Sequence, residues 1–218
     1  MIRIMKNIFK SILCLFVVFL SSCDTDSTGD ISDTTDYAVI EMNGSDEVII
    51  NQGDAWTDPS ANVTLAGAPY PFETSTVVDP NVPGVYYITY SAVNDLGFSA
   101  SATRTVVVVS TAPSIYNFEG NWTRLPTSGT RKGVCTQISD RYYTYDNAGG
   151  VAGVNQLTVT FINVDDSVIY IPFVENASPS GLSVRSFQPG TITDGDNFSW
   201  SLSASGFYGT FTRNFTRE

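Results

Sequence analysis

The sequence predicts an all-β protein, and three observations carry that prediction. Val, Thr, Tyr, Phe and Ser are frequent, and 12% of the residues are aromatic. Gly and Pro recur at short intervals between these runs, which is the spacing of short strands and turns. No long segment repeats apolar side chains at the 3.6-residue period of a helix. We therefore expect an N-terminal β-sandwich and a C-terminal antiparallel meander, the latter either a sandwich or a barrel.

Residues 1–22 have the anatomy of a secretory signal peptide. Basic residues open the segment, residues 11–20 are apolar, and small residues precede Cys23. The apolar run is shorter than the ~20 residues that a transmembrane helix needs. Residues 20–23 (LSSC) resemble the bacterial lipobox, in which the cysteine is lipidated and becomes the first mature residue. The resemblance implies lipidation of Cys23; the alternative is an ordinary signal peptide with a chance cysteine.

The mature chain is strongly acidic. Cleavage before Cys23 leaves eight of the 11 basic residues and all 22 acidic ones, a net charge of 8 - 22 = -14. Binding to nucleic acid depends on Lys and Arg, so we expect no nucleic-acid partner and membrane contact through the lipid anchor only. Residues 23–37 are rich in Asp, Ser and Thr and are expected to form a flexible acidic tether. Acidic residues after the cysteine resemble the export signal of Bacteroides lipoproteins, which implies an outer-membrane location facing the cell exterior.

Residues that many active sites require are missing or isolated. The chain has no histidine, which removes Ser-His-Asp and Cys-His pairings and every histidine-containing zinc site. Cys14 lies in the signal peptide, so Cys135 remains alone and is expected to be a buried apolar side chain in a strand. No phosphate-binding glycine loop or zinc-type cysteine spacing occurs. We therefore expect a protein that is not an enzyme and has no cofactor.

Residues 38–110 are expected to form the first domain. Its clearest strand covers residues 85–93, in which Tyr86, Ile88 and Tyr90 alternate to one face. The turn at residues 94–97 returns the chain into a strand over residues 98–109. The other expected strands cover residues 37–42, 47–51, 61–65 and 72–78.

Spaced motifs in this domain resemble a known family. They are residues 53–59 (GDAWTDP), 83–90 (PGVYYITY), 94–97 (NDLG) and 102–106 (ATRTV). Together they look like a bacterial immunoglobulin-like repeat of surface proteins and of one group of pesticidal crystal toxins. The resemblance implies an immunoglobulin-like sandwich that serves mainly as a spacer or adhesive unit, and such a fold does not define a site. Trp56 replaces the usual Tyr or Phe and is expected to be a core or edge aromatic.

Residues 114–218 are expected to form a C-terminal β domain after a short linker. Its Gly120-Asn121-Trp122 opening resembles the start of lipocalin-like barrels. The order of signal peptide, tether and two β domains resembles a set of Bacteroides surface lipoproteins of unknown function, which are often linked with glycan uptake. The strands expected in this domain cover residues 134–138, 141–146, 157–163, 167–173, 182–187, 198–204 and 207–215.

Sugar binding is the first functional hypothesis for the C-terminal domain. Aromatic faces pack against sugar C–H groups, and this domain is rich in rings. Alternation places Tyr143 and Tyr145 on one strand face and Tyr142 on the other, so one set is expected in the core and the other at the surface. The rings predicted to bind a polysaccharide or oligosaccharide are Trp122, Tyr143, Tyr145, Trp200 and Tyr208.

Other hypotheses stay open beside sugar binding. The protein is a structural or protein-interaction subunit of an outer-membrane complex, or its C-terminal domain is a lipocalin-like carrier of a small apolar ligand. Coplanar exposed rings would favour sugar, an apolar patch would favour outer-membrane protein partners, and a filled core would exclude the carrier. Asp194 and Asp196 also offer oxygen ligands suited to calcium, but a plain Asp-Gly turn is the favoured interpretation.

Replacing Cys23 with Ser is expected to move nearly all of the protein out of the membrane fraction, because the lipid is attached to the thiol. Cys14→Ser, inside the apolar run, is the matched control and leaves the chain membrane-bound. Cell fractionation and mass spectrometry of the mature N-terminus measure both outcomes. If the Cys23→Ser protein is still recovered in the membrane fraction, the lipobox interpretation is wrong.

Overall fold

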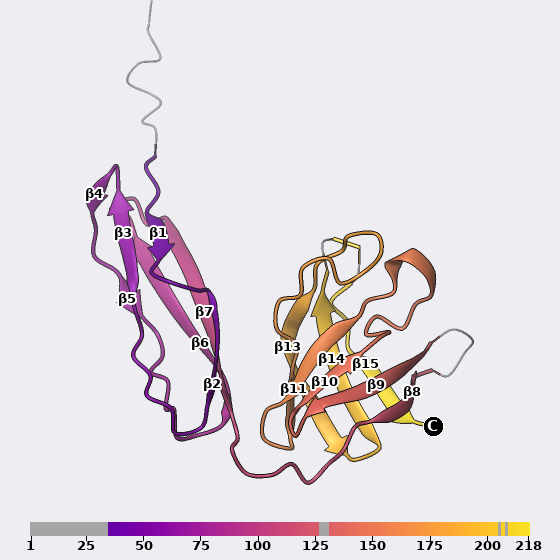
Figure 1. Cartoon of the computed structure of the whole chain (residues 1–218). Coiled ribbons are helices and arrows are strands. Elements are labelled where there is room, and N and C mark those ends of the chain that lie inside the picture. The colour runs from indigo at the N-terminus through magenta and orange to yellow at the C-terminus, as the bar shows by residue number, and fades with distance from the viewer. Residues whose placement is uncertain (1–34, 127–130, 205, 208) are drawn as a thin grey trace, which may run out of the picture. The chain divides into compact units, whose positions relative to one another are not determined.

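The structure is a computed structural model of the chain, and it describes residues 35–126, 131–204, 206–207 and 209–218 (Figure 1). The predicted signal peptide, the lipidation at Cys23, most of the tether and the predicted binding ring of Tyr208 lie outside the described residues. In the described part, no helix is long and apolar enough to span a membrane. The predicted all-β fold is confirmed: β-strands make up the described secondary structure apart from a short 3-10 helix, Gly153–Asn155.

Two small sheets form the N-terminal module, drawn in indigo to magenta in Figure 1. The first sheet has the order β1-β3-β4, and the second has the order β2-β7-β6-β5. Strand β2 runs parallel to β7, and the other pairs are antiparallel. The strand expected over residues 72–78 is reduced to two residues, and β4 is an additional short strand. The bounds are β1 Val39–Met42, β2 Glu47–Asn51, β3 Ala61–Leu65, β4 Ala68–Pro69, β5 Glu73–Thr74, β6 Gly84–Val93 and β7 Ser99–Val109.

A common apolar core lies between the two sheets. Ile88 and Tyr90 of β6 and Val106 of β7 are fully buried, and Ala61 of β3 packs in the same cluster. Trp56 is partly buried against this cluster, so it is an edge aromatic, as expected. Alternation along β6 and β7 thus turns one face of the second sheet toward the first, which is the arrangement of a β-sandwich.

This core also contains a buried charge. Arg104 is fully buried, pairs with the carboxylate of Asp58, and donates hydrogen bonds to the Tyr90 hydroxyl at 2.8 Å and the Ser45 carbonyl at 2.9 Å. The Tyr90 hydroxyl donates to Asp58 at 2.7 Å. Burial and the Asp58 carboxylate raise the pKa of Tyr90 to about 12, against the effect of the Arg104 charge, so the phenol stays protonated. Three of the four spaced sequence motifs meet in this network.

A second polar network fixes the linker that follows β7. Arg141, which is 4% exposed, donates to the Ala112 carbonyl at 2.8 Å and pairs with Asp166 at 3.1 Å. Asn163 donates to the same carboxylate at 2.7 Å. Burial by itself raises the pKa of Asp166, but hydrogen bonds from Arg141, Asn163 and Ser114 outweigh burial and lower it. The carboxylate is therefore a charged anchor for the linker.

Within residues 37–218, side chains of the second sheet also contact strands of the C-terminal module. Val107 and Val109 of β7 are buried in one cluster with Ile162 and Tyr170. The Tyr170 hydroxyl donates to the Glu47 carboxylate at 2.6 Å, and the Phe173 backbone N–H donates to the other oxygen of that carboxylate at 2.8 Å. Apolar burial and hydrogen bonds thus reinforce each other at this contact.

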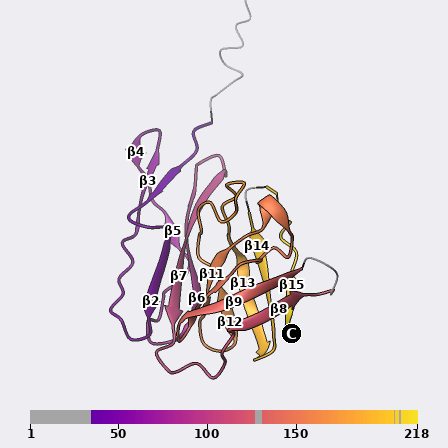
Figure 2. The ribbon, with the colours of Figure 1, turned by 45° about the vertical axis from the view of Figure 1, so that its right-hand side comes forward.

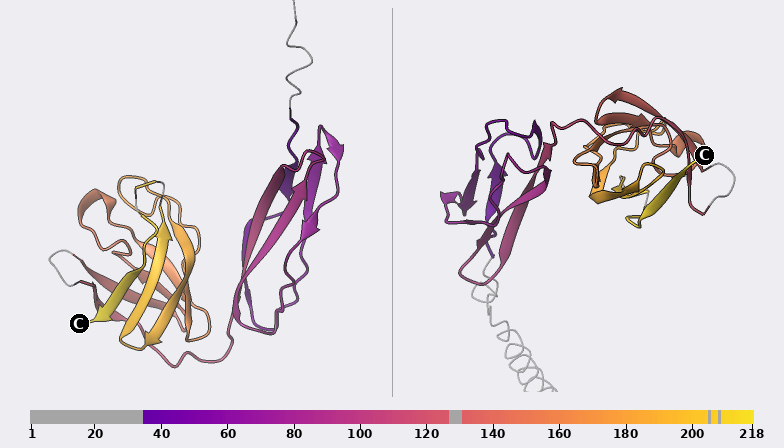
Figure 3. Two further views of the ribbon diagram at one scale, coloured as in Figure 1. Left: turned by 180° about the vertical axis from the view of Figure 1, so that it is seen from behind. Right: turned by 90° about the horizontal axis from the view of Figure 1, so that it is seen from below.

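The C-terminal module is a closed antiparallel barrel of eight strands (Figures 2 and 3). Consecutive strands pair as neighbours, and β15 pairs with β8 to close the ring through Phe215–Arg124, Thr216–Thr123 and Arg217–Trp122. The structure therefore decides between the sandwich and the barrel that the sequence left open. The bounds are β8 Gly120–Arg124, β9 Lys132–Ser139, β10 Tyr142–Tyr145, β11 Val159–Asn163, β12 Val168–Tyr170, β13 Arg185–Asp194, β14 Asn197–Ser203 and β15 Arg213–Arg217.

Three barrel strands differ from those expected. Strand β8 is additional, β15 begins later than the strand expected from residue 207, and β13 continues to Asp194. Strand β13 contains Pro189 and several register shifts, and proline is tolerated in a sheet at such irregularities. The adjacent Gly190 is required, because a Cβ there would lie 2.3 Å from the Ser199 carbonyl oxygen. Pro189 therefore does not end the strand but lies at an irregular position within it.

Arg104→Met is expected to destabilise the N-terminal module by about 3 kcal/mol, because it leaves the Asp58 carboxylate without its buried partner. Hydrogen exchange of the β6 and β7 amides measures the opening free energy of this module separately from the barrel. Arg185→Met is the control, since that partly exposed guanidinium lies 3.6 Å from Asp46 and is expected to matter by less than about 0.5 kcal/mol. If the β6 and β7 amides exchange equally fast in Arg104→Met and Arg185→Met, the buried ion pair does not stabilise this module as expected.

Candidate functional site

Trp122 and Trp200, two of the predicted sugar-binding rings, lie in the barrel core. Their exposed fractions are 0% and 1%. The Trp122 indole N–H donates to the Phe118 carbonyl at 2.8 Å, and the Trp200 N–H donates to the Ala148 carbonyl at 3.0 Å. Trp122 lies 4.5 Å from Phe198, measured between ring centroids. Both indoles therefore have their polar atom satisfied and their faces covered by other rings.

Tyr143 and Tyr145, two further predicted rings, are also completely buried. The Tyr143 hydroxyl donates to the Asp140 carbonyl at 3.2 Å and to the Tyr116 carbonyl at 3.3 Å. The Tyr145 hydroxyl is buried and has no hydrogen-bond partner among the described residues. Burial raises the pKa of both phenols, so both stay neutral.

The interpretation of these four rings as an exposed sugar platform is therefore corrected. Alternation places Tyr143 and Tyr145 on one face, as predicted, and closure of the barrel turns that face inward. A sugar outside the barrel cannot reach these rings. They belong to a cluster with many mutual ring contacts, which comprises Phe118, Trp122, Tyr143, Tyr145, Phe161, Phe198, Trp200 and Phe215.

The same cluster bears on the carrier hypothesis. A lipocalin-like carrier needs a cavity inside its barrel, and eight-stranded barrels are only just wide enough for side chains to fill. Here, fully buried aromatic and aliphatic side chains from the described strands occupy that interior. The burial of these side chains argues against the carrier hypothesis, which requires a cavity inside the barrel.

The two carboxylates of the turn considered as a calcium site, Asp194 and Asp196, are bound by other groups of the protein. The Asp194 carboxylate accepts hydrogen bonds from the Asp196 backbone N–H at 2.8 Å and the Asn197 side-chain amide at 3.0 Å, and these bonds lower its pKa. Asp196 pairs with Arg217 at 2.7 Å. Among the described residues, no group of three or more Cys, Asp or Glu side chains is arranged to hold a metal ion. The plain turn accounts for both aspartates.

Cys135 is 1% exposed in β9. Burial raises the pKa of its thiol to about 12, with smaller opposing effects from nearby charges. A thiol with such a pKa stays protonated at neutral pH, whereas the thiolate is the nucleophilic form. Cys135 is therefore a core side chain, as expected from the sequence.

Among the described residues of the C-terminal module, the exposed aromatic rings are phenylalanines. Phe173, Phe187, Phe207 and Phe211 are 47%, 52%, 55% and 55% exposed. The Arg185 guanidinium lies 4.9 Å from the Phe173 ring centroid, and Phe187 is an exposed residue of the same strand, at a register shift against β14. We call Phe173, Arg185 and Phe187 the β13 patch. The strands expected over residues 167–173 and 182–187 contain these three residues, but no sequence pattern indicates that Phe173 and Arg185 are in contact.

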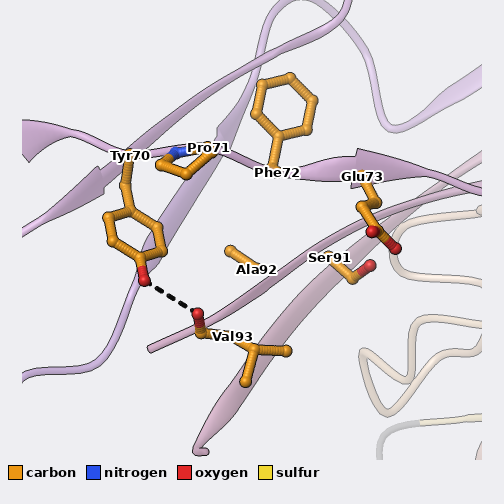
Figure 4. A pocket seen from close by; sticks show the side chains of 7 residues that line it. All are labelled: Tyr70, Pro71, Phe72, Glu73, Ser91, Ala92 and Val93. Atoms are coloured by element: carbon orange, nitrogen blue, oxygen red, sulfur yellow. Dashed lines mark hydrogen bonds between the residues drawn. The ribbon is translucent and has the colours of Figure 1, made fainter. Parts of the chain in front are cut away.

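A pocket of about 470 Å³ lies on the N-terminal module, where the chain passes from β4 to β5 (Figure 4). Its volume falls within the ~300–1,000 Å³ typical of ligand pockets. In Figure 4, Phe72 points to the side opposite Tyr70 and Glu73, and its ring lies 6.2 Å from the Tyr90 ring of β6, measured between centroids. No sequence motif marks this pocket, because it depends on where β5 stops. The lining residues are Tyr70, Pro71, Phe72, Glu73, Ser91, Ala92 and Val93.

Comparison with known proteins identifies the class of the first module. Residues 40–108 match the family model described as a bacterial surface protein, Ig-like domain. The predicted resemblance of this region to bacterial immunoglobulin-like repeats is thus confirmed. Among solved structures, the chain is similar to the crystal structure of the lipoprotein BT2262 from Bacteroides thetaiotaomicron, at 21% identity and a TM-score of 0.34, over 84% of this chain and 100% of that one. No curated protein matches the sequence.

Tyr145→Phe is expected to raise the stability of the barrel by about 1 kcal/mol, because it removes a buried hydroxyl that has no partner. Tyr143→Phe is the matched control: it removes a bonded hydroxyl and is expected to lower stability by about 1 kcal/mol. Denaturant midpoints at constant slope measure both changes. Opposite signs support the placement of these rings in the core, and equal losses contradict it.

Proposed function

We propose that this protein is a lipid-anchored, non-catalytic component of the outer-membrane surface whose barrel contacts a protein partner. The lipobox-like segment and the acidic residues after it support the anchor and the outward location. The match of residues 40–108 to an Ig-like domain of bacterial surface proteins supports a spacer role for the first module. In this proposal, the tether and spacer hold the barrel away from the membrane.

The observation that carries the proposal is the filled interior of the barrel. Four of the five rings predicted for ligand binding are buried in this cluster, which supports a role for the outer surface of the barrel. On that surface, the β13 patch combines two half-exposed phenylalanine rings with a guanidinium. Aromatic residues and Arg are enriched where proteins bind proteins, and isolated rings of this size anchor such contacts.

The non-catalytic part of the proposal follows from the state of the reactive groups. The chain has no histidine, and the Cys135 thiol is buried and neutral. The Asp166 carboxylate, a member of the one adjacent aspartate pair, is bound by Arg141 and Asn163. The Cys135 thiol is thus part of the core, and the Asp166 carboxylate is bound within the protein.

The test uses the full lipidated chain in its native cells. A photo-crosslinking amino acid at Phe187 is expected to give a discrete adduct with an outer-membrane protein, whereas the same probe at Thr136, exposed on β9, gives none. Phe187→Ser is expected to weaken co-purification of that partner about tenfold, the effect of losing one aromatic anchor. Equal adducts at both positions, or none at Phe187, contradict a protein contact at the β13 patch.

A further inference from the structure

The pocket in Figure 4 exists because β5 ends early. Antiparallel pairing places Glu73 opposite Ser91, and the Ser75 backbone N–H donates to the Thr89 carbonyl at 3.0 Å. The same register, continued by two residues, places Pro71 opposite Val93. Proline has no N–H to donate, so the ladder stops there. The chain then crosses to the first sheet, where the Tyr70 N–H donates to the Val63 carbonyl at 2.9 Å.

Tyr70 replaces the missing donor. Its hydroxyl donates to the Val93 carbonyl at 2.9 Å, which fixes the phenol ring as one wall of the pocket (Figure 4). The Val93 N–H faces the same side of the strand as that carbonyl, and no described residue accepts a hydrogen bond from it. The pocket thus combines an aromatic wall with an unused backbone donor.

Other polar groups of the pocket lie on the two strands. Glu73 is exposed and brings a carboxylate, which is an acceptor, and Ser91 directly opposite brings a hydroxyl that both donates and accepts. Ala92, which is 3% exposed, also lines the pocket, and alternation along β6 turns its methyl group to the face opposite Ser91. One aromatic face, one carboxylate, one hydroxyl and one backbone N–H therefore surround a space of about 470 Å³.

This set of groups discriminates between ligand classes. No Lys or Arg lines the pocket, and Glu73 would repel an anion, so an anionic ligand is disfavoured. Addition of a peptide strand needs several consecutive free backbone groups on an edge. Beyond β5, only Val93 offers them, because the next residue, Asn94, already donates to the Phe98 carbonyl in the hairpin. A purely apolar ligand would leave the carboxylate side of the pocket without a partner.

We propose that this pocket binds one neutral saccharide unit. The hydroxyl groups of a sugar can donate to Glu73 and accept from Ser91 and the Val93 N–H, and its C–H face can pack on the Tyr70 ring, whose face carries negative charge. The site lies on the spacer module and involves none of the predicted rings. It is independent of the protein contact proposed for the β13 patch.

The test is saturation-transfer NMR on the full chain in a detergent that contains no sugar. The probes are the methyl glycosides of glucose, galactose, mannose and N-acetylglucosamine, each at about 10 mM, enough to fill a site of ~1 mM Kd. Glucuronate and N-acetyl-lysine methylamide serve as the anionic and cationic comparisons. We expect transfer to at least one neutral glycoside and a weaker signal from both charged probes.

Two variants test the residues, and a third is the control. Glu73→Gln keeps the shape of an exposed side chain and is expected to weaken binding about tenfold, and Tyr70→Leu removes the aromatic wall and abolishes binding. Glu41→Gln, an exposed carboxylate on β1, is expected to leave binding unchanged. Circular dichroism and thermal unfolding verify that each variant is folded.

Several results would overturn the proposal. The first is no saturation transfer to any neutral glycoside. The second is transfer only to a charged probe, either the lysine derivative or glucuronate. The third is equal glycoside binding by folded Glu73→Gln and the unchanged chain. Crosslinking at Phe187 does not involve this pocket, so its outcome is read separately.

Discussion

The pairing of β15 with β8 is the constraint on which the C-terminal module depends. Three residue pairs join the last strand to the first, and they leave the meander without an open edge. Once the ring is closed, alternation along every strand divides side chains into an inner and an outer set. The inner set is aromatic, and Trp200 and Phe215 from β14 and β15 approach to 4.6 Å between centroids. Closure of the barrel therefore determines which rings are buried in the core and which face solvent.

The N-terminal module depends on a different kind of interaction. Its core is small, and part of it is the fully buried Arg104 with Asp58 and Tyr90. A buried ion pair contributes little net stability, but either partner is harmful without the other. The three residues come from separate strands and loops, so their network favours one arrangement of the two sheets. This explains physically how three of the four spaced motifs act together in this module.

The two surfaces proposed to bind a ligand or a partner lie where regular structure is interrupted. The pocket on the N-terminal module opens because Pro71 cannot continue β5, and the Tyr70 hydroxyl replaces the missing backbone donor. The β13 patch lies on a strand interrupted by register shifts around Pro189. In both places the proline has no backbone N–H to donate to a neighbouring strand. The regularly paired strands of both modules contribute their inward-facing side chains to the cores.

Much of the fold follows from the sequence, because strand position is a local property. Alternation and turn residues predict β6 within one residue, and they place Tyr143 and Tyr145 on a common face. The sequence by itself also determined the absence of histidine, the acidic charge and the lipobox-like Cys23. Which face points inward was decided only by the tertiary structure, since closure joins β8 and β15, far apart in the chain. The same non-local pairing buried four of the five predicted sugar-binding rings, and the end of β5 against β6 leaves a pocket that no sequence motif indicates.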